Sequence, residues 1–307
     1  MKLRTSPIDR ARILRVLLHI EANLDKPLEL DALADRAALS PYHFHRLFRT
    51  VVGEPPQRHI RRLRLERAAL FLKNSTAPTV ELAVPAGFDS REGFSRAFTA
   101  HFGQSPAAFR ERAAAALRQL LRQLEGTPPL AVRLEECRSR FVVLTRVVGS
   151  PFRVMDAWVQ FLRWARRRGL AHRDSLIAQI NHDDEIVTPW HKHRTDLCLV
   201  LPEPVEAEPP YVRSTLPGGW HAVADFQGSA YGLYRAWLDL TERWLPGSGW
   251  HPAHHFFYDL GRAELIPTSL LAAMPLLLGG IRVQLCVPVE RRPRPSWPVL
   301  VPPDVAR

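Results

Sequence analysis

The sequence has few cysteines and a shortage of acidic side chains. Its three cysteines, Cys137, Cys198 and Cys286, form no CxxC pair, a pattern typical of reduced thiols in a cytosolic chain. Lysine and arginine number 42 against 31 aspartates and glutamates, a net charge of +11. Residues 1–125 hold 21 basic and 13 acidic side chains, a net of +8, whereas residues 126–307 hold 21 and 18, a net of +3. A basic amino-terminal segment indicates a nucleic-acid binder.

Long hydrophobic runs are also missing. The most apolar window, residues 270–281, contains Pro275 and is too short to span a bilayer. Arg15 and His19 interrupt the apolar stretch near the start, which excludes a signal peptide there. We therefore expect a soluble, cytoplasmic and nucleoid-associated protein with no membrane partner. At 307 residues it exceeds one typical core, so we expect two domains.

The first third of the chain contains a repeat. Residues 44–56 read FHRLFRTVVGEPP and residues 94–106 read FSRAFTAHFGQSP. Apolar periodicity and capping residues predict helices around both copies. These are expected over residues 8–24, 28–39, 41–52, 61–73, 79–88 and 89–102. A helix, a tight break and a second helix form a helix-turn-helix unit, and the pattern occurs twice.

The repeated phenylalanines and arginines should lie on opposite faces of their helices. Phe44 and Phe48 are four residues apart, as are Phe94 and Phe98, so each pair shares a buried face. The arginine between them, at position 46 or 96, then points outward. An outward arginine on an ordinary helix is usually only solvated. The duplication, the basic charge and the helix-turn-helix pattern together favour reading of DNA bases.

Longer motifs give this region a specific likeness. They are LxxLAxxAxLSPxHFxRLF (30–48), RLRLERAALFL (62–72), LAVPAGFDSREGFSRAF (82–98) and FGQSPAAFR (102–110). Residues 8–112 thereby resemble the DNA-binding domain of the AraC/XylS family of bacterial transcription regulators, over about a third of the chain. The resemblance implies an all-α domain over residues 1–112 with two helix-turn-helix units joined by a long helix. Its expected partners are double-stranded DNA and RNA polymerase, and an activator is the expected kind of regulator.

The resemblance also implies which side chains meet DNA. These are Tyr42, His43, His45, Arg46 and Arg49 in the first recognition helix, and Ser90, Arg91, Glu92, Ser95 and Arg96 in the second. Arg49, Arg61 and Arg62 would hold phosphates rather than read bases.

Three residues near the second recognition helix depart from the family pattern. Pro85 interrupts the preceding helix, and Gly93 weakens the recognition helix by roughly 1 kcal/mol. Glu92 replaces a usual serine. With Asp89 as N-cap, Glu92 would complete a capping box; otherwise it is placed to accept from a cytosine amine. We therefore expect the first recognition helix to be the stronger reader.

The remaining two-thirds contain a second duplication. Residues 113–129 are expected to form a linker helix and boundary, since Gly126 and a Pro pair end them. GSPFRVMDAW (149–158) then matches GSAYGLYRAW (228–237) at an offset of 79. Each copy follows an apolar strand, opens a helix and precedes two further strands. The strands are expected over residues 141–148, 175–181, 196–202, 221–226, 255–260 and 281–289. Two strand-helix-strand-strand repeats predict an α+β domain with a ligand groove between its halves.

Residues 130–292 are similar to the GyrI-like effector-binding domain. The resemblance implies an aromatic pocket for a small, aromatic or lipophilic effector, with Trp158, Trp190, Tyr234, Trp237, His255 and Phe257 as its residues. In the family a central glutamate pairs with cationic ligands, and here His255 takes the equivalent position. A neutral or anionic aromatic ligand is then at least as well accommodated.

Other functions remain open for the second domain. His255 with Asp259 or Asp184 suggests a general base, so a hydrolase is one alternative. A degenerate sensor that binds only protein partners is another. The histidines of HPAHH (251–255), with those of WHKH and NHDD, lack an established metal-ligand spacing, so we expect neither metal nor cofactor. Residues 293–307 form a Pro-rich tail that is expected to be extended.

Overall fold

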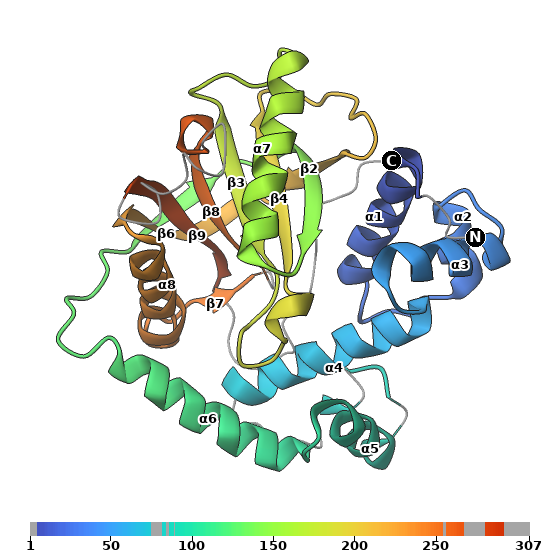
Figure 1. The fold of residues 1–307 in the computed structure, drawn as a ribbon. Helices are drawn as coiled ribbons and strands as arrows, with labels where there is room; N and C mark the ends of the chain where they lie inside the picture. Colours follow the sequence, from blue (N-terminus) through green and yellow to red (C-terminus); the bar gives the residue numbers. More distant parts are fainter. Residues whose placement is uncertain are drawn as a thin grey trace. The chain divides into compact units, whose positions relative to one another are not determined.

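The protein folds into two compact units that meet in sequence mainly between Leu117 and Arg118. The computed structural model describes residues 5–74, 82–83, 86–88, 90–253, 256–266 and 280–291. The first unit is helical and the second is built on a sheet, as the ribbon in Figure 1 shows. Within the described ranges, no helix combines the length and the apolar character needed to cross a membrane.

The helical unit confirms the first predicted helix-turn-helix motif and both predicted recognition helices. Its helices are α1 (Pro7–Ala22), α2 (Leu30–Arg36), α3 (Pro41–Val52), α4 (Pro56–Asn74), α5 (Arg91–Phe102) and α6 (Pro106–Arg122). The helix expected over 79–88 and its Pro85 lie largely outside the described residues, although Gly87 does take the left-handed turn conformation, with φ +75°. The predicted linker helix is the later part of α6, which begins earlier than residue 113.

Matched caps define the two recognition helices, α3 and α5. The Ser40 hydroxyl accepts from the His43 N–H at 3.4 Å, and the Ser90 hydroxyl accepts from the Gly93 N–H at 3.1 Å. At the other end, Gly53 and Gly103 take left-handed φ angles of +88° and +70°, which stop the helices without a Cβ penalty.

The cap of α5 corrects one expectation. Asp89 was expected as its N-cap, but Ser90 holds that place, and Asp89 lies outside the described residues. Glu92 is therefore the second residue of the helix rather than the third. The predicted capping box is wrong, because that motif needs the carboxylate at the third position.

The sheet unit confirms the second duplication and adds strands that the sequence did not predict. Its strands are β1 (Arg133–Cys137), β2 (Arg140–Val148), β3 (Leu176–Asn181), β4 (Arg194–Leu201), β5 (Val212–Leu216), β6 (Gly219–Gly228), β7 (His251–Pro252), β8 (Phe257–Arg262) and β9 (Ile281–Glu290). Helix α7 (Pro151–Arg167) follows β2, and helix α8 (Ala230–Leu238) follows β6. The repeat is thus β2-α7-β3-β4 and β6-α8-β8-β9.

Strand order shows how the two halves join. In the described chain the sheet runs β1-β6-β9-β8-β3-β4-β2-β5, with β7 paired to β9. Strands β3 and β8 meet antiparallel at the centre, which makes the two halves symmetric about that junction. Strand β1 precedes β2 in sequence but pairs with β6, and β5 precedes β6 but adjoins β2. The strand that precedes each repeat, β1 or β5, therefore forms the edge of the sheet beside the other repeat.

Candidate nucleic-acid interface and effector site

Helix α3 has one buried and one exposed face. Phe44, Leu47 and Phe48 are buried in a core with α1, α2 and the start of α4. Tyr42 is 78% exposed, and Arg46 and Arg49 are exposed beside it. The predicted outward orientation of Arg46 is therefore confirmed.

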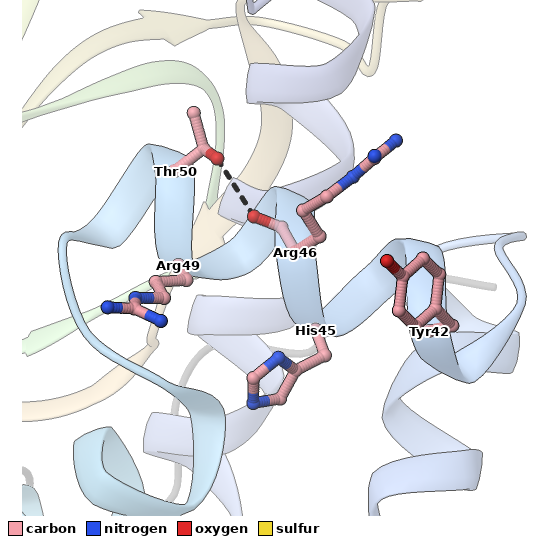
Figure 2. A pocket seen from close by; sticks show the side chains of 5 residues that line it. All are labelled: Tyr42, His45, Arg46, Arg49 and Thr50. Carbon is pink, nitrogen blue, oxygen red and sulfur yellow. Dashed lines mark hydrogen bonds between the residues drawn. The ribbon is translucent and has the colours of Figure 1, made fainter. Parts of the chain in front are cut away.

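The exposed face of α3 forms a shallow depression of about 400 Å³. Its lining residues are Tyr42, His45, Arg46, Arg49 and Thr50, whose side chains Figure 2 shows projecting from the helix. The Arg46 guanidinium carbon lies 5.9 Å from the centre of the Tyr42 ring. The Thr50 hydroxyl donates to the Arg46 carbonyl at 2.8 Å, so it is satisfied within the helix (Figure 2). Aromatic, imidazole and guanidinium groups thus lie open on one helical face.

Helix α5 repeats this arrangement at an offset of fifty residues. Phe94, Ala97 and Phe98 are buried, whereas Arg91, Glu92 and Arg96 are exposed. Ser95 is half-buried, like its counterpart His45. His43 is exposed at the start of α3, and its counterpart Gly93 offers no side chain. The second helix therefore has the same geometry with a less basic face.

The Glu92 carboxylate stays available for an external partner. It makes no hydrogen bond or ion pair with the described part of the chain, and it is exposed in the first turn of α5. Of the two roles considered for Glu92, the capping role is excluded, because Glu92 is the second residue of the helix and a capping box needs the third. Cytosine offers an amine donor in the major groove that a carboxylate can accept.

Arg62 corrects another expectation. It was expected to hold a DNA phosphate, but it is only 8% exposed and pairs with two carboxylates of its own unit. Its Nη1 lies 2.8 Å from Glu66 Oε2, and its Nη2 lies 2.8 Å from Glu54 Oε1. Arg49 and Arg61 remain exposed, as a phosphate-binding role requires.

In the sheet unit, matching tryptophans bind matching polar side chains. Trp158 of α7 donates its indole N–H to Gln179 Oε1 on β3 at 3.1 Å. Trp237 of α8 donates its indole N–H to Asp259 Oδ1 on β8 at 2.7 Å. Gln179 and Asp259 are direct cross-strand partners, so their side chains point to one face of the sheet, the face that both helices cover. This polar pair lies at the symmetric junction of the halves.

The two residues of this pair differ in exposure: Asp259 is buried and Gln179 is not fully so. Gln179 lies on a central strand beneath the helices, yet it is only half-buried. Trp237 and Tyr234 on α8, with Phe257 on β8, are also half-buried, and the rings of Trp237 and Phe257 stack at 5.9 Å. Gln179, Trp237 and Phe257 therefore keep partial exposure on the face of the sheet that α7 and α8 cover.

Asp259 is a buried carboxyl without a cationic partner in the described chain. Burial raises the pKa of Asp259 to about 7, and the hydrogen bond from Trp237 only partly opposes the shift. The sequence suggested Asp259 solely as a partner of a catalytic His255. That histidine lies outside the described residues, so the suggestion stays a prediction; among the described residues Asp259 accepts from Trp237. Gln179 and Asp259 are polar residues in otherwise mostly apolar strands, but their pairing depends on the register between β3 and β8.

The other expected effector residues differ in burial. Trp158 is 2% exposed and belongs to the core, apart from its indole N–H. Tyr234 is half-buried on α8; burial, together with the hydrogen-bonded Glu185 carboxylate, raises the pKa of its hydroxyl to about 12. Trp190 is 65% exposed, and the structure records its ring against His191 rather than against the other aromatics.

Two of the histidines weighed as metal ligands are hydrogen-bonded within the fold. His182 Nε2 lies 2.8 Å from Asp196 Oδ2, and His193 Nε2 lies 2.8 Å from the Thr188 carbonyl oxygen. Asp184 accepts from the Ile186 N–H at 2.9 Å. Across the described residues, no group of three or more His, Cys, Asp or Glu side chains is arranged to hold a metal.

Comparison with known proteins places both units. A family model described as a helix-turn-helix domain matches residues 33–112, and a model described as a GyrI-like small molecule binding domain matches residues 131–268. The chain is 38% identical over 126 residues to the Right origin-binding protein of Escherichia coli (strain K12), covering 40% of this chain and 44% of that protein. It therefore spans less than half the length of this relative.

Two shorter relatives are covered more fully. The HTH-type transcriptional activator AarP of Providencia stuartii is 36% identical over 98 residues, which are 32% of this chain and 73% of AarP. The Regulatory protein SoxS of Salmonella typhimurium is 32% identical over 102 residues, which are 33% of this chain and 95% of SoxS. A double helix-turn-helix unit followed by a GyrI-like unit defines a class of regulator architecture. The chain belongs to the AraC/XylS family of transcription regulators.

Asp259 should make the stability of the sheet unit depend on pH. Its folded pKa is raised above the unfolded value of 3.8, so its stabilising contribution is complete below that value and is lost as pH rises through about 7. Asp259→Asn keeps an oxygen for Trp237 and cannot ionise. Between pH 4 and 8.5, the free energy of unfolding of the wild type should fall relative to the variant by up to about 4 kcal/mol. Denaturant unfolding at several pH values measures this difference, and a constant difference would contradict the assignment.

Proposed function

We propose that this chain is a sequence-specific DNA-binding transcription regulator that reads two successive major-groove segments with α3 and α5. The observation that carries the proposal is the matched burial of the two helices, which leaves Arg46 and Arg96 outward at equivalent positions. The basic charge of residues 1–125 supports it. So do the names of its relatives, which are those of regulators and an activator.

Each exposed residue has a proposed role. Arg46 and Arg96 pair with guanine through bidentate hydrogen bonds, and Glu92 accepts from a cytosine amine. Tyr42 contacts a base edge or a thymine methyl group with its exposed ring. Arg49 and Arg61 bind phosphates and fix the register. Such a regulator works in the cytoplasm on nucleoid DNA, with RNA polymerase as its further partner.

The sheet unit is proposed to bind the effector at a site over Gln179 and Asp259. The aromatic side chains of Trp237, Tyr234 and Phe257 supply its wall, and the polar pair supplies its floor. A buried carboxylate without a cationic partner in the described chain favours a planar aromatic cation. Asp259 thereby favours a cation, whereas His255 alone made a neutral or anionic aromatic ligand at least as well accommodated.

Arg46→Ala should weaken binding to the selected site by about 1–3 kcal/mol, because a bidentate contact with a base is lost. Arg96→Ala should cost less, since the face of α5 also presents Glu92. Fluorescence anisotropy on a duplex selected by the wild-type chain measures both losses of affinity. Arg167→Ala, at an exposed position of α7, is the charge-matched control. A loss confined to Arg96→Ala would show that the second helix is the stronger reader.

Ligand charge should decide binding at the sheet unit. At pH 8, N-methylacridinium should quench tryptophan fluorescence with an affinity that falls about tenfold in Asp259→Asn, because the counter-charge is removed. Uncharged acridine should bind both forms alike, and Asp174→Asn at an exposed position provides the matched control. Equal affinity of the cation for wild type and Asp259→Asn would rule out this site.

A further inference from the structure

In both helix-turn-helix units, the second residue after the recognition helix accepts hydrogen bonds from an arginine eight residues further along the chain. Glu54 follows the left-handed Gly53, and Gln104 follows the left-handed Gly103. Two residues later a proline begins the next helix, α4 or α6. Glu54 and Gln104 therefore lie in the short turns that join recognition helices to the helices after them.

In the first unit this contact is an ion pair. Glu54 Oε1 accepts from Arg62 Nε at 2.9 Å and lies 2.8 Å from Arg62 Nη2. The same oxygen lies 2.9 Å from His59 Nδ1, and Glu66 closes the group by binding Arg62 Nη1 through both oxygens at 2.8 and 3.0 Å. We call Glu54, His59, Arg62 and Glu66 the first clamp.

In the second unit an amide takes the place of the carboxylate. With its amide oriented to satisfy both groups, Gln104 Oε1 accepts from Arg112 Nε at 2.9 Å and from Arg112 Nη2 at 3.0 Å. The Arg112 guanidinium carbon lies 5.1 Å from the centre of the Phe109 ring. Gln104, Phe109 and Arg112, the second clamp, each stand fifty residues after their counterparts in the first.

A ring contact beneath each clamp is also conserved between the repeats. Phe48 of α3 meets His59 of α4 edge-on at 5.5 Å, and Phe98 of α5 meets Phe109 of α6 edge-on at the same distance. Each recognition helix is thus joined to the following helix by this ring contact and a clamp, and in the second unit Phe102 of α5 adds another ring contact with Phe109 at 4.9 Å.

The two clamps differ in charge and in shielding. In the first, Arg62 and Glu66 are 8% and 4% exposed, so the charge-assisted bonds are shielded from water. Burial alone would raise the pKa of Glu54, but the His59 and Arg62 bonds lower it to about 2. In the second, Arg112 is exposed and its acceptor is neutral. The first recognition helix is therefore held more firmly than the second.

We propose that Glu54 and Gln104 are matched positioning residues, each of which fixes the angle of the preceding recognition helix through the arginine eight residues further on. The proposal rests on the proposed function, because it concerns helices that read DNA. Bidentate pairing with a base tolerates little displacement, so a helix that rocks on its ring contact loses base contacts before phosphate contacts. Loss of a clamp should therefore lower specific binding and spare non-specific binding.

The test uses the full-length chain, a duplex that the wild type selects from a random pool, and a poly(dA-dT) duplex as the non-specific probe. Glu54→Ala should bind the selected duplex about tenfold more weakly, the loss expected for a charge-assisted bond, with unchanged affinity for poly(dA-dT). Glu54→Gln should retain most of the specific affinity, because in the second clamp an amide oxygen accepts from the Nε and Nη2 of the corresponding arginine.

A second variant distinguishes the loss of a clamp from general destabilisation of the unit. Gln104→Ala removes a contact at the edge of the unit, and it should relax base preference only in the half-site read by α5. The preference in the half-site read by α3 should stay as in the wild type. General destabilisation would weaken both half-sites together.

The outcomes separate the clamp from the function it serves. If the wild type selects no sequence, the proposed function fails and the clamp proposal with it. If the wild type selects a site but folded Glu54→Ala and Gln104→Ala keep the wild-type ratio of specific to non-specific affinity, only the clamp proposal is overturned. An equal loss on both duplexes overturns it as well, since a positioning residue changes that ratio.

Discussion

Burial of two phenylalanines one turn apart in each recognition helix is the constraint on which the DNA-reading surface depends. Phe44 with Phe48, and Phe94 with Phe98, face the core at 0–1% exposure. Because helical periodicity then leaves positions 46 and 96 outward, the core itself orients the arginines. The same rings continue into the contacts with His59 and Phe109 that seat each recognition helix on its successor. Core packing thus sets the orientation of each recognition helix, and the polar residues of the clamps strengthen its attachment to the following helix.

Both duplications in this chain keep geometry and change charge. In the helical unit the matched positions are Glu54 and Gln104, which accept from arginines in the same way. In the sheet unit they are Gln179 and Asp259, which accept from indole N–H groups in the same way. Carboxylate and amide have similar shapes, so each exchange alters electrostatics without repacking. One copy in each pair carries a carboxyl group and the other an amide.

The sequence predicted both repeats because their apolar periodicity is strong: α3 was predicted over its full extent, and six of the strands near their observed bounds. Strands β1 and β5 were missed, since RLEEC and VRSTL are short, largely polar edge segments. Arg62 was misjudged although Glu66, four residues on, is within helical spacing; its second partner, Glu54, lies in the turn before α4, eight residues away, where no helical pattern predicts it. The Gln179–Asp259 pair depends on the register between β3 and β8, which no local pattern encodes.

Selection of bound duplexes from a random pool by the full-length chain tests the central claim most directly. Two recognition helices that enter successive major-groove segments predict two short conserved blocks about one helical turn apart. The block read by α3 should carry the stronger base preference, because its face presents Arg46 and Arg49 without a neighbouring carboxylate. Recovery of duplexes with no enriched sequence, or with a single block, would contradict this account.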